Sequence, residues 1–324
     1  MRLASLKNNS RDGELVFVDD ELSKIKIVGS DIPTLQFALD HWQNIYKTLT
    51  VRYKLFLANK SKEADYIADN MHAPLPRAYQ WLDGSAYVHH VELARKSRGV
   101  VMPESFWVEP LMYQGGSDTF LSATDDFVLI DEKFGLDLEA ELAVVTDDVP
   151  LGVNENEALD HIRLIVLLND WSYRELISPE LAKGFGFVNS KPSTSFAPIA
   201  LTPDEFGDLW KEGKLNLTVE SKVNDIKIGE PNASEDMVFG FGKLISHAAK
   251  TRNLSAGSII GSGTIANRNL IKGSSCLMEK RMLEILANGK ASTPYLKFGD
   301  TVSIEVFNNN KSIFGAIHQK VVKG

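Results

Sequence analysis

The clearest pattern along the chain is an alternation of apolar and acidic positions between residues 136 and 145. This segment reads Leu-Asp-Leu-Glu-Ala-Glu-Leu-Ala-Val-Val. Because successive side chains of a β-strand point to opposite faces, Glu139 and Glu141 share one face and the apolar residues between them share the other. Two carboxylates side by side on a strand repel each other unless a positive group lies near them. The pattern therefore predicts a strand whose acidic face needs a cation.

Apolar residues spaced three and four positions apart predict four helices. The first is expected to begin near Pro33, because proline is favoured in the first helical turn, and the last is expected to be capped by Ser234. The expected helices cover residues 33–49, 156–168, 171–181 and 234–248. Short runs of β-branched and apolar residues predict strands at 15–18, 25–28, 215–219, 226–228, 258–265, 302–307 and 313–322.

Two prolines, Pro74 and Pro76, mark an expected boundary between two domains. Proline ends helices and favours extended backbone in the residue before it. Residues 1–75 are expected to form a small N-terminal β-rich domain. Residues 76–324 are expected to form a larger, strand-rich domain that carries the chemistry. We therefore expect an α+β, mainly β fold.

Composition and charge exclude several classes of function. The 324-residue chain has a net charge of -8, so no electrostatic argument supports binding to nucleic acid or to an anionic membrane surface. Its single cysteine, Cys276, excludes an intrachain disulfide and a cysteine-rich zinc site. The N-terminal residues lack the apolar core of a signal peptide, and no apolar run is long enough to span a bilayer. We expect a cytoplasmic protein.

Further carboxylates can join Glu139 and Glu141. Asp170 follows the apolar run 164–168, so it lies at the end of a buried element, and Asp83 offers a fourth carboxylate. Carboxylates without nearby cysteine suit a hard, oxygen-binding cation such as Mg²⁺ or Ca²⁺. The alternative interpretation is a solvated strand face with an aspartate at the end of a helix.

Three basic residues are candidates for acid–base or electrostatic roles. His90 is a candidate general base, because imidazole titrates near neutrality. On a strand, His89 would face the opposite way, so only one of the two can serve. Arg174 lies four residues after Asp170 and would share a helical face with it. Lys191 has no acidic neighbour in sequence and could bind a carboxylate or stabilise an enolate. The alternatives are packing, an ordinary salt bridge and a solvated loop lysine.

Six short motifs occur in a fixed order along residues 76–324. They are Asp83 with a histidine seven residues on, Tyr-Gln-Gly-Gly at 113–116, Asp-Leu-Glu-Ala-Glu-Leu-Ala at 137–143, Asn-Asp-Trp-Ser-Tyr-Arg at 169–174, Lys191 seven residues before Pro198, and Gly-Ser-Gly-Thr-Ile at 261–265. In combination they resemble the fumarylacetoacetate hydrolase superfamily. Residues 1–75 also resemble the β-rich N-terminal domain of fumarylacetoacetases, which shorter members usually lack.

The resemblance implies a catalytic domain of mixed β-roll type with a divalent cation in its mouth, Mg²⁺ or Ca²⁺, with Mn²⁺ as an alternative. The implied ligands are Asp83, Glu139, Glu141 and Asp170. His90 would be the base, oriented by a glutamate for which Glu279 is the first match and Glu284 and Glu92 stay open. The implied contacts to substrate come from Ser85, Tyr113, Arg174, Lys191 and Thr264.

The resemblance further implies hydrolysis of a C–C bond in a β-diketo acid, with fumarylacetoacetate of tyrosine and phenylalanine breakdown as the first candidate and a homodimer as the assembly. Acylpyruvate hydrolase, oxaloacetate decarboxylase and 2-oxopent-4-enoate hydratase activities stay open, as does a non-catalytic metal-binding role. One position departs from the pattern: Ile177 stands where animal-type fumarylacetoacetases have a glutamine. This departure places the substrate contacts on that side in question.

Overall fold

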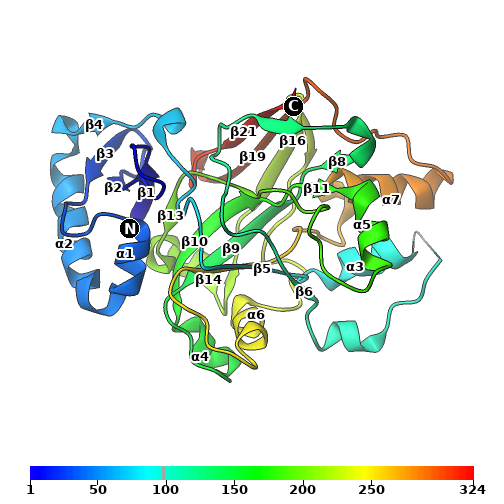
Figure 1. The fold of residues 1–324 in the computed structure, drawn as a ribbon, viewed down its shortest axis with the longest axis horizontal. Coiled ribbons are helices and arrows are strands. Elements are labelled where there is room, and N and C mark those ends of the chain that lie inside the picture. The colour runs from blue at the N-terminus through cyan, green and yellow to red at the C-terminus, as the bar shows by residue number, and fades with distance from the viewer. Residues whose placement is uncertain (97–98) are drawn as a thin grey trace.

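The computed structural model describes residues 1–96 and 99–324. The first 75 residues form four strands and two helices that lie together at one end of the molecule (Figure 1, blue). Thr34 caps the first helix by accepting a hydrogen bond from the backbone of Phe37, and His41 separates the two helices. The elements are β1 (Arg2–Leu6), β2 (Glu14–Val18), β3 (Lys24–Ile27), α1 (Leu35–Asp40), α2 (Trp42–Asn59) and β4 (Ala64–Asp65). The single helix expected at 33–49 is therefore two helices, which extend to Asn59.

A mixed sheet runs through both parts of the chain in the order β4-β3-β2-β1-β13-β10-β9-β18-β5-β6, with β12 also paired to β10. The join is the pairing of β1 with β13, in which Leu3 lies opposite Ala200. The division at residue 75 stays a prediction, because hydrogen bonds cross between the two parts. The strands after the N-terminal unit are β5 (Gln80–Gly84), β6 (Met112–Gln114), β9 (Ala140–Thr146), β10 (Ile162–Asn169), β12 (Ser195–Phe196), β13 (Ala200–Leu201) and β18 (Ser258–Gly261).

A second sheet has the order β17-β16-β19-β21-β7, with β20 paired to β19. Its strands are β7 (Phe127–Leu129), β16 (Val219–Val223), β17 (Ile226–Gly229), β19 (Thr301–Asn308), β20 (Lys311–Ser312) and β21 (Ile317–Lys323). Two further short antiparallel pairs are β8 (Leu136–Asp137) with β11 (Ser172–Tyr173), and β14 (Trp210–Lys211) with β15 (Lys214–Leu215). These mixed sheets with inserted helices confirm the predicted fold class.

The helices after residue 75 are short. Figure 1 shows α3, α5 and α7 at the end of the molecule far from the N-terminal unit. The α-helices are α3 (Val88–Lys96), α4 (Glu155–Leu159), α5 (Arg174–Leu181), α6 (Phe241–Ala248) and α7 (Leu277–Asn288). The 3-10 turns are η1 (Lys60–Lys62), η2 (Ala68–Asn70), η3 (Glu104–Trp107), η4 (Glu132–Phe134), η5 (Pro203–Leu209) and η6 (Leu270–Lys272). None of the described helices has the length and apolar character that crossing a membrane requires.

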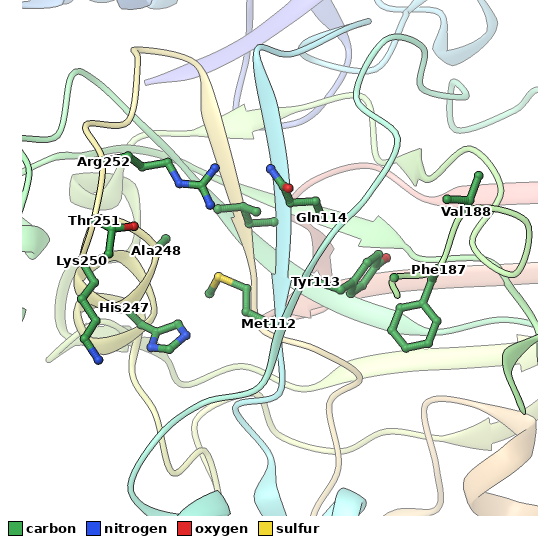
Figure 2. A pocket seen from close by; sticks show the side chains of 12 residues that line it. Met112, Tyr113, Gln114, Phe187, Val188, His247, Ala248, Lys250, Thr251 and Arg252 are labelled. Carbon is green, nitrogen blue, oxygen red and sulfur yellow. The ribbon is translucent and has the colours of Figure 1, made fainter. Parts of the chain in front are cut away.

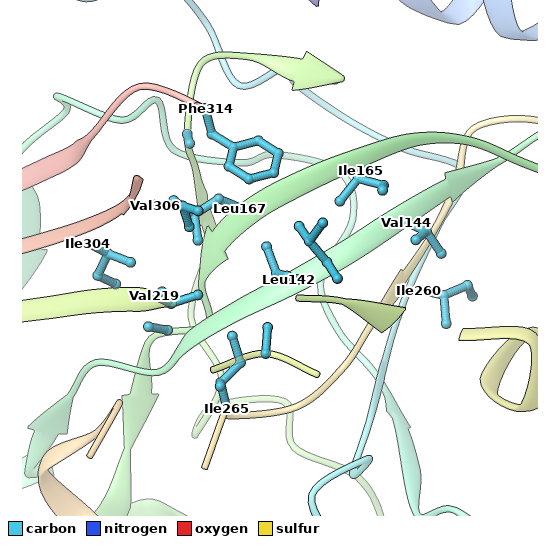
Figure 3. Close-up of a cluster of buried hydrophobic side chains, with 14 of the residues drawn as sticks. Leu142, Val144, Ile165, Leu167, Val219, Ile260, Ile265, Ile304, Val306 and Phe314 are labelled. Carbon is cyan, nitrogen blue, oxygen red and sulfur yellow. The ribbon is translucent and has the colours of Figure 1, made fainter. Parts of the chain in front are cut away.

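The helix predicted at 156–168 is wrong. Only Glu155–Leu159 is helical, and Ile162–Asn169 is strand β10. Both faces of this strand are buried, since Ile165 belongs to the core between the two sheets (Figure 3) and Leu164 to the core beneath α1 and α2. A strand buried on both faces is apolar at nearly every position, and periodicity cannot distinguish it from a buried helix.

Two smaller expectations are also wrong. Ser234 does not cap a helix: Asn232 accepts hydrogen bonds from its backbone and its hydroxyl, and α6 begins later, at Phe241 after Gly240. The segment with His89 and His90 is helix α3 rather than a strand. Neighbours on a helix are still turned away from each other, so only one histidine can face a given site.

Candidate active site and metal centre

Three buried carboxylates from separate segments of the larger sheet lie close together. Asp83 lies on β5, Glu141 lies on β9, and Asp170 directly follows β10. Each offers an oxygen, and these oxygens all lie within 4.8 Å of one another. Strand β18 lies between β5 and β9, and a Cβ atom at its Gly261 would lie 2.3 Å from Oδ1 of Asp83. Glycine is therefore needed where the strand passes beneath this carboxylate.

The cluster has the properties of an oxygen-ligand cation site. Among the described residues, neither carboxylate oxygen of Glu141 has a hydrogen-bond partner, although both oxygens are buried. Burial and the charge of Asp170 raise the pKa of Asp83 to about 8, and burial with the charge of Asp83 raises the pKa of Glu141 well above its usual range. Buried carboxylates without donors are costly unless a cation compensates them. The residues present therefore fit a hard divalent cation.

Lys191 balances part of this negative charge. Its Nζ lies 2.5 Å from Oε2 of Glu139 and 2.5 Å from Oδ2 of Asp170, so its acidic partners come from distant parts of the sequence. Asp170 also accepts hydrogen bonds from the hydroxyl of Tyr113 at 2.6 Å and from that of Thr194 at 2.9 Å. Glu139 is not one of the three clustered carboxylates, and its oxygens pair with Lys191 and Arg174. Its role as a fourth metal ligand stays a prediction.

Two cationic side chains determine the pKa of Glu139. Burial alone would raise its pKa, but Arg174 and Lys191 outweigh this effect and lower the pKa to about 2. The sequence suggested that Arg174 and Asp170 share a helical face, but the two side chains do not pair. Instead, Nε of Arg174 donates to Asp137 at 2.9 Å, and its Nη2 lies 2.6 Å from Oε1 of Glu139.

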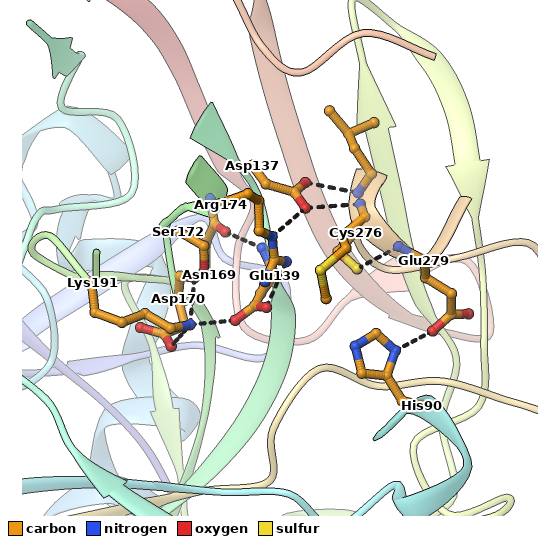
Figure 4. Close-up of polar contacts among 12 residues, drawn as sticks. His90, Asp137, Glu139, Asn169, Asp170, Ser172, Arg174, Lys191, Cys276 and Glu279 are labelled. Carbon is orange, nitrogen blue, oxygen red and sulfur yellow. Dashed lines mark hydrogen bonds and ion pairs between the residues drawn. The ribbon is translucent and has the colours of Figure 1, made fainter. Parts of the chain in front are cut away.

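His90, which is partly buried, forms a hydrogen-bonded pair with the buried Glu279 (Figure 4). Nδ1 of His90 lies 2.5 Å from Oε2 of Glu279, which is 1% exposed. The other two candidate partners are elsewhere: Glu284 accepts hydrogen bonds from Ser292 and Thr293, and Glu92 is exposed. Because an ionised carboxylate only accepts, Nδ1 donates to it and Nε2 is left as the basic nitrogen. This is the arrangement of a histidine held ready to take a proton.

Family models match nearly the whole chain. The model for the C-terminal domain of fumarylacetoacetate hydrolase matches residues 80–322, and that for fumarylacetoacetase N-terminal domain 2 matches residues 1–77. The chain belongs to the fumarylacetoacetate hydrolase family. The match confirms the family resemblance that the six motifs in residues 76–324 indicated.

Several curated relatives share part of the chain. A 2,4-didehydro-3-deoxy-L-rhamnonate hydrolase of a Sphingomonas species is 29% identical over 48% of this chain and 53% of its own length. An oxaloacetate tautomerase of Bacillus subtilis is 26% identical over 60% of this chain and 61% of its own length. The fumarylacetoacetase of Emericella nidulans is 27% identical over 52% of this chain and 46% of its own length. The matches thus span about half of these relatives.

Solved structures share the fold over the full length. The maleylpyruvate hydrolase of Sphingobium sp. SYK-6, in complex with manganese(II) and pyruvate, has a TM-score of 0.66 and 17% identity, and the match covers 100% of both chains. At this identity the likeness concerns the fold, including the N-terminal unit. Maleylpyruvate and manganese are the substrate and the bound metal of that enzyme.

A cavity of about 200 Å³ is lined by two of the acidic residues, Asp83 and Glu139, and by His90. The residues expected to contact substrate all line it: Ser85, Tyr113, Arg174, Lys191 and Thr264. Their roles in binding stay predictions. Sequence reasoning missed Tyr87, Phe187 and Met278, which also line the cavity but have no ionisable group at neutral pH that would mark them as site residues. The cavity is smaller than the roughly 300–1,000 Å³ of typical ligand sites, which favours a small acid.

A second cavity of about 650 Å³ adjoins the first (Figure 2). Tyr113 and Phe187 line both cavities, and their rings meet edge to face with centroids 5.2 Å apart. The other labelled side chains include Met112, Gln114, His247, Lys250 and Arg252. Among the described residues that line it there is no carboxylate, so we assign the metal and the chemistry to the smaller cavity.

The raised carboxyl pKa values predict how metal and pH act together on stability. The folded protein without metal holds a proton on Asp83 up to about pH 8, whereas the unfolded chain releases it near its ordinary value of 3.8. Because the folded state binds more protons, this group makes stability fall as pH rises between those values. A bound cation replaces the proton. The rise in Tm caused by Mg²⁺ or Mn²⁺ should therefore grow from about pH 5.5 to about pH 8.

Thermal unfolding with chelator and with metal at several pH values measures this difference. At each pH, the difference between the Tm with metal and the Tm with chelator removes the contribution of groups that titrate equally in both conditions. An increment that stays constant or shrinks with pH would show that Asp83 and Glu141 are not the carboxyls that the metal deprotonates.

Proposed function

We propose that the protein is a metal-dependent hydrolase that cleaves the C–C bond of a β-diketo acid, with fumarylacetoacetate, giving fumarate and acetoacetate, as the first substrate to test. The observation that supports this proposal most directly is that one cavity is lined by Asp83 of the carboxylate cluster, by Glu139 and by His90, whose Nδ1 is held by Glu279. Hydrolysis of a diketone needs a polarised carbonyl, a base for water and a group that stabilises the departing enolate.

The residues divide these tasks. A divalent cation held by Asp83, Glu141 and Asp170, with Glu139 as the fourth ligand, would polarise the carbonyl groups of the substrate. Nε2 of His90 takes a proton from water as the oxygen adds to the carbonyl carbon, and Glu279 stabilises the resulting imidazolium. The C–C bond then breaks and its electron pair moves into the departing enolate.

Two cationic residues and the histidine complete the reaction. The ammonium of Lys191 lies at the cavity wall and stabilises the negative charge of the enolate. Its pKa is raised, since Asp170 and Glu139 outweigh the effect of burial, so it stays charged at neutral pH. The proton on His90 then passes to the enolate carbon. The products are two acids, and water supplies the atoms that are added.

The second candidate substrate class is the acylpyruvates. Ile177 lines the cavity at the position where animal-type fumarylacetoacetases have a glutamine, so an apolar side chain faces the substrate there. The full-length structural neighbour acts on maleylpyruvate by its name, and another solved neighbour is a fumarylpyruvate hydrolase with manganese and pyruvate bound. Manganese therefore joins magnesium and calcium among the cations to test, and oxaloacetate joins the substrate panel because of the tautomerase relative.

The deciding experiment follows the ultraviolet loss of fumarylacetoacetate with purified protein, before chelation, after chelation, and after Mg²⁺ or Mn²⁺ is added back. Rapid loss that chelation stops and metal restores supports the proposal and would place the protein in tyrosine degradation. Slow loss, with faster turnover of an acylpyruvate or of oxaloacetate in the same assay, moves the assignment to that substrate. Tight metal binding with no turnover across the panel supports a non-catalytic role. Sedimentation of the same sample tests the homodimer.

A further inference from the structure

Helix α7 begins with backbone N–H groups that donate hydrogen bonds to two buried side chains. Asp137 accepts from Leu277 at 2.7 Å through Oδ1 and from Met278 at 2.9 Å through Oδ2. The Sγ atom of Cys276 accepts from the N–H of Glu279 at 3.3 Å. These N–H groups have no partners within a helix. The first turn is therefore fixed in both rotation and position.

This same turn carries the partner of the histidine. Glu279 is adjacent to Met278, and its carboxylate reaches Nδ1 of His90 at 2.5 Å. A small rotation of the first turn of α7 would move the carboxylate away from the imidazole. The hydrogen bond between Glu279 and His90 thus depends on how Asp137 and Cys276 hold the start of the helix.

Asp137 also reaches the metal side of the site (Figure 4). Besides the two backbone groups, it accepts a hydrogen bond from Nε of Arg174 at 2.9 Å, and Arg174 pairs with Glu139. The β8–β11 pairing places Asp137 opposite Ser172, two residues after Asp170. Asp137 is 0% exposed and does not line the cavity, so it can act only through these neighbours.

We propose that Asp137 is a positioning residue: its one buried carboxylate fixes both the His90–Glu279 pair, through the start of α7, and Glu139, through Arg174. This inference rests on the proposed function and deepens it. It explains why an acidic residue that touches neither the cavity nor the cation cluster stands two positions before Glu139. A change at Asp137 should therefore disturb both the acid–base pair and the metal site.

The test is Asp137→Asn, which keeps the shape of the side chain but removes its charge. Its amide NH₂ group would lie opposite one of the backbone N–H donors of α7, where only an acceptor can form a hydrogen bond. Loss of a residue that holds a metal ligand in place typically lowers metal affinity or activity by about 10–100-fold. We expect kcat to fall by about this factor with a smaller change in KM, and Mn²⁺ affinity, measured without substrate, to weaken by about 10-fold or more. The low-field proton resonance of the His90–Glu279 hydrogen bond, assigned by its loss in Glu279→Gln, should disappear or broaden.

Asn154→Ala is the matched control, because Asn154 likewise accepts from two backbone N–H groups, at the start of α4. It should lower stability and leave the proton resonance, the metal affinity and kcat unchanged. If Asp137→Asn behaves like Asn154→Ala, Asp137 is only a helix cap and the proposal fails. If Asp137→Asn does not fold, Asp137→Ser decides: its hydroxyl can still accept from one N–H of α7, but it offers no carboxylate to Arg174, so Mn²⁺ affinity must still weaken. Because the resonance and Mn²⁺ affinity need no turnover, they test the role even if no diketo acid proves to be a substrate.

Discussion

Replacing Glu141 with glutamine should abolish metal binding and turnover together. Glu141 contributes two buried carboxylate oxygens to the cluster, and among the described residues no donor lies in hydrogen-bonding geometry to them, so a bound cation would satisfy both oxygens. A neutral amide offers one weaker oxygen ligand and an NH₂ group that repels a cation. Loss of a residue that only supports a metal ligand typically lowers affinity or activity by about 10–100-fold. Because Glu141 would itself be a ligand, we expect larger losses of metal affinity and of kcat/KM.

The same substitution should have the opposite effect on the protein without metal. Burial and the charge of Asp83 disfavour an ionised Glu141, and glutamine removes this cost while its NH₂ can donate to Asp83. We expect the Tm in chelator to rise, by about 2–4 °C for each kcal/mol gained in a domain of this size. The increase in Tm on adding Mg²⁺ or Mn²⁺ should vanish.

Titration calorimetry with Mn²⁺ and thermal unfolding with and without chelator measure both effects. Glu92→Gln is the control, because Glu92 is an exposed glutamate on α3 that offers no atom to the carboxylate cluster. It should bind metal and unfold like the original protein. A Glu141→Gln protein that still binds Mn²⁺ tightly, or that loses stability in chelator, would contradict the proposed metal site.

The acidic side of the site could be predicted from the sequence because its signals are local. An alternation of period two places Glu139 and Glu141 on one face, and an apolar run that ends before Asp170 places that carboxylate at the edge of the core. Glu141, Asp170 and Asp83 indeed converge. The strand is less regular than the alternation suggested, since β8 ends at Asp137 and β9 begins at Ala140, leaving Glu139 between them.

The remainder depends on contacts between distant residues. Lys191 pairs with Glu139 and Asp170, and nothing near Lys191 in the sequence indicates either partner. The choice of Glu279 over Glu284 and Glu92 needed the position of α7, which only the folded structure supplies. Likewise, the fully buried strand β10 carries no periodicity that separates it from a helix, so its prediction failed for a physical reason.

Replacing His90 with alanine should remove turnover while leaving the metal in place. His90 offers no ligand to the carboxylate cluster, and its Nδ1 is occupied by Glu279. Loss of a general base typically costs about 10²–10⁴-fold in rate. We expect kcat to fall within this range, and Mn²⁺ affinity and the metal-dependent rise in Tm to change little. This separation of effects is the reverse of that expected for Glu141→Gln, in which metal and turnover are lost together.

The neighbouring histidine supplies the control. His89 is 4% exposed, and neither of its ring nitrogens has a hydrogen-bond partner among the described residues, so it forms no hydrogen bond with the residues of the site. His89→Ala should keep kcat within a few-fold, whereas Glu279→Gln should reproduce part of the His90→Ala defect. In the double variant His90→Ala/Glu279→Gln the two losses should not add, because Glu279 acts only through the imidazole. If His90→Ala retains its activity, or if the two losses add fully, water is activated without His90 and the assignment of the base is wrong.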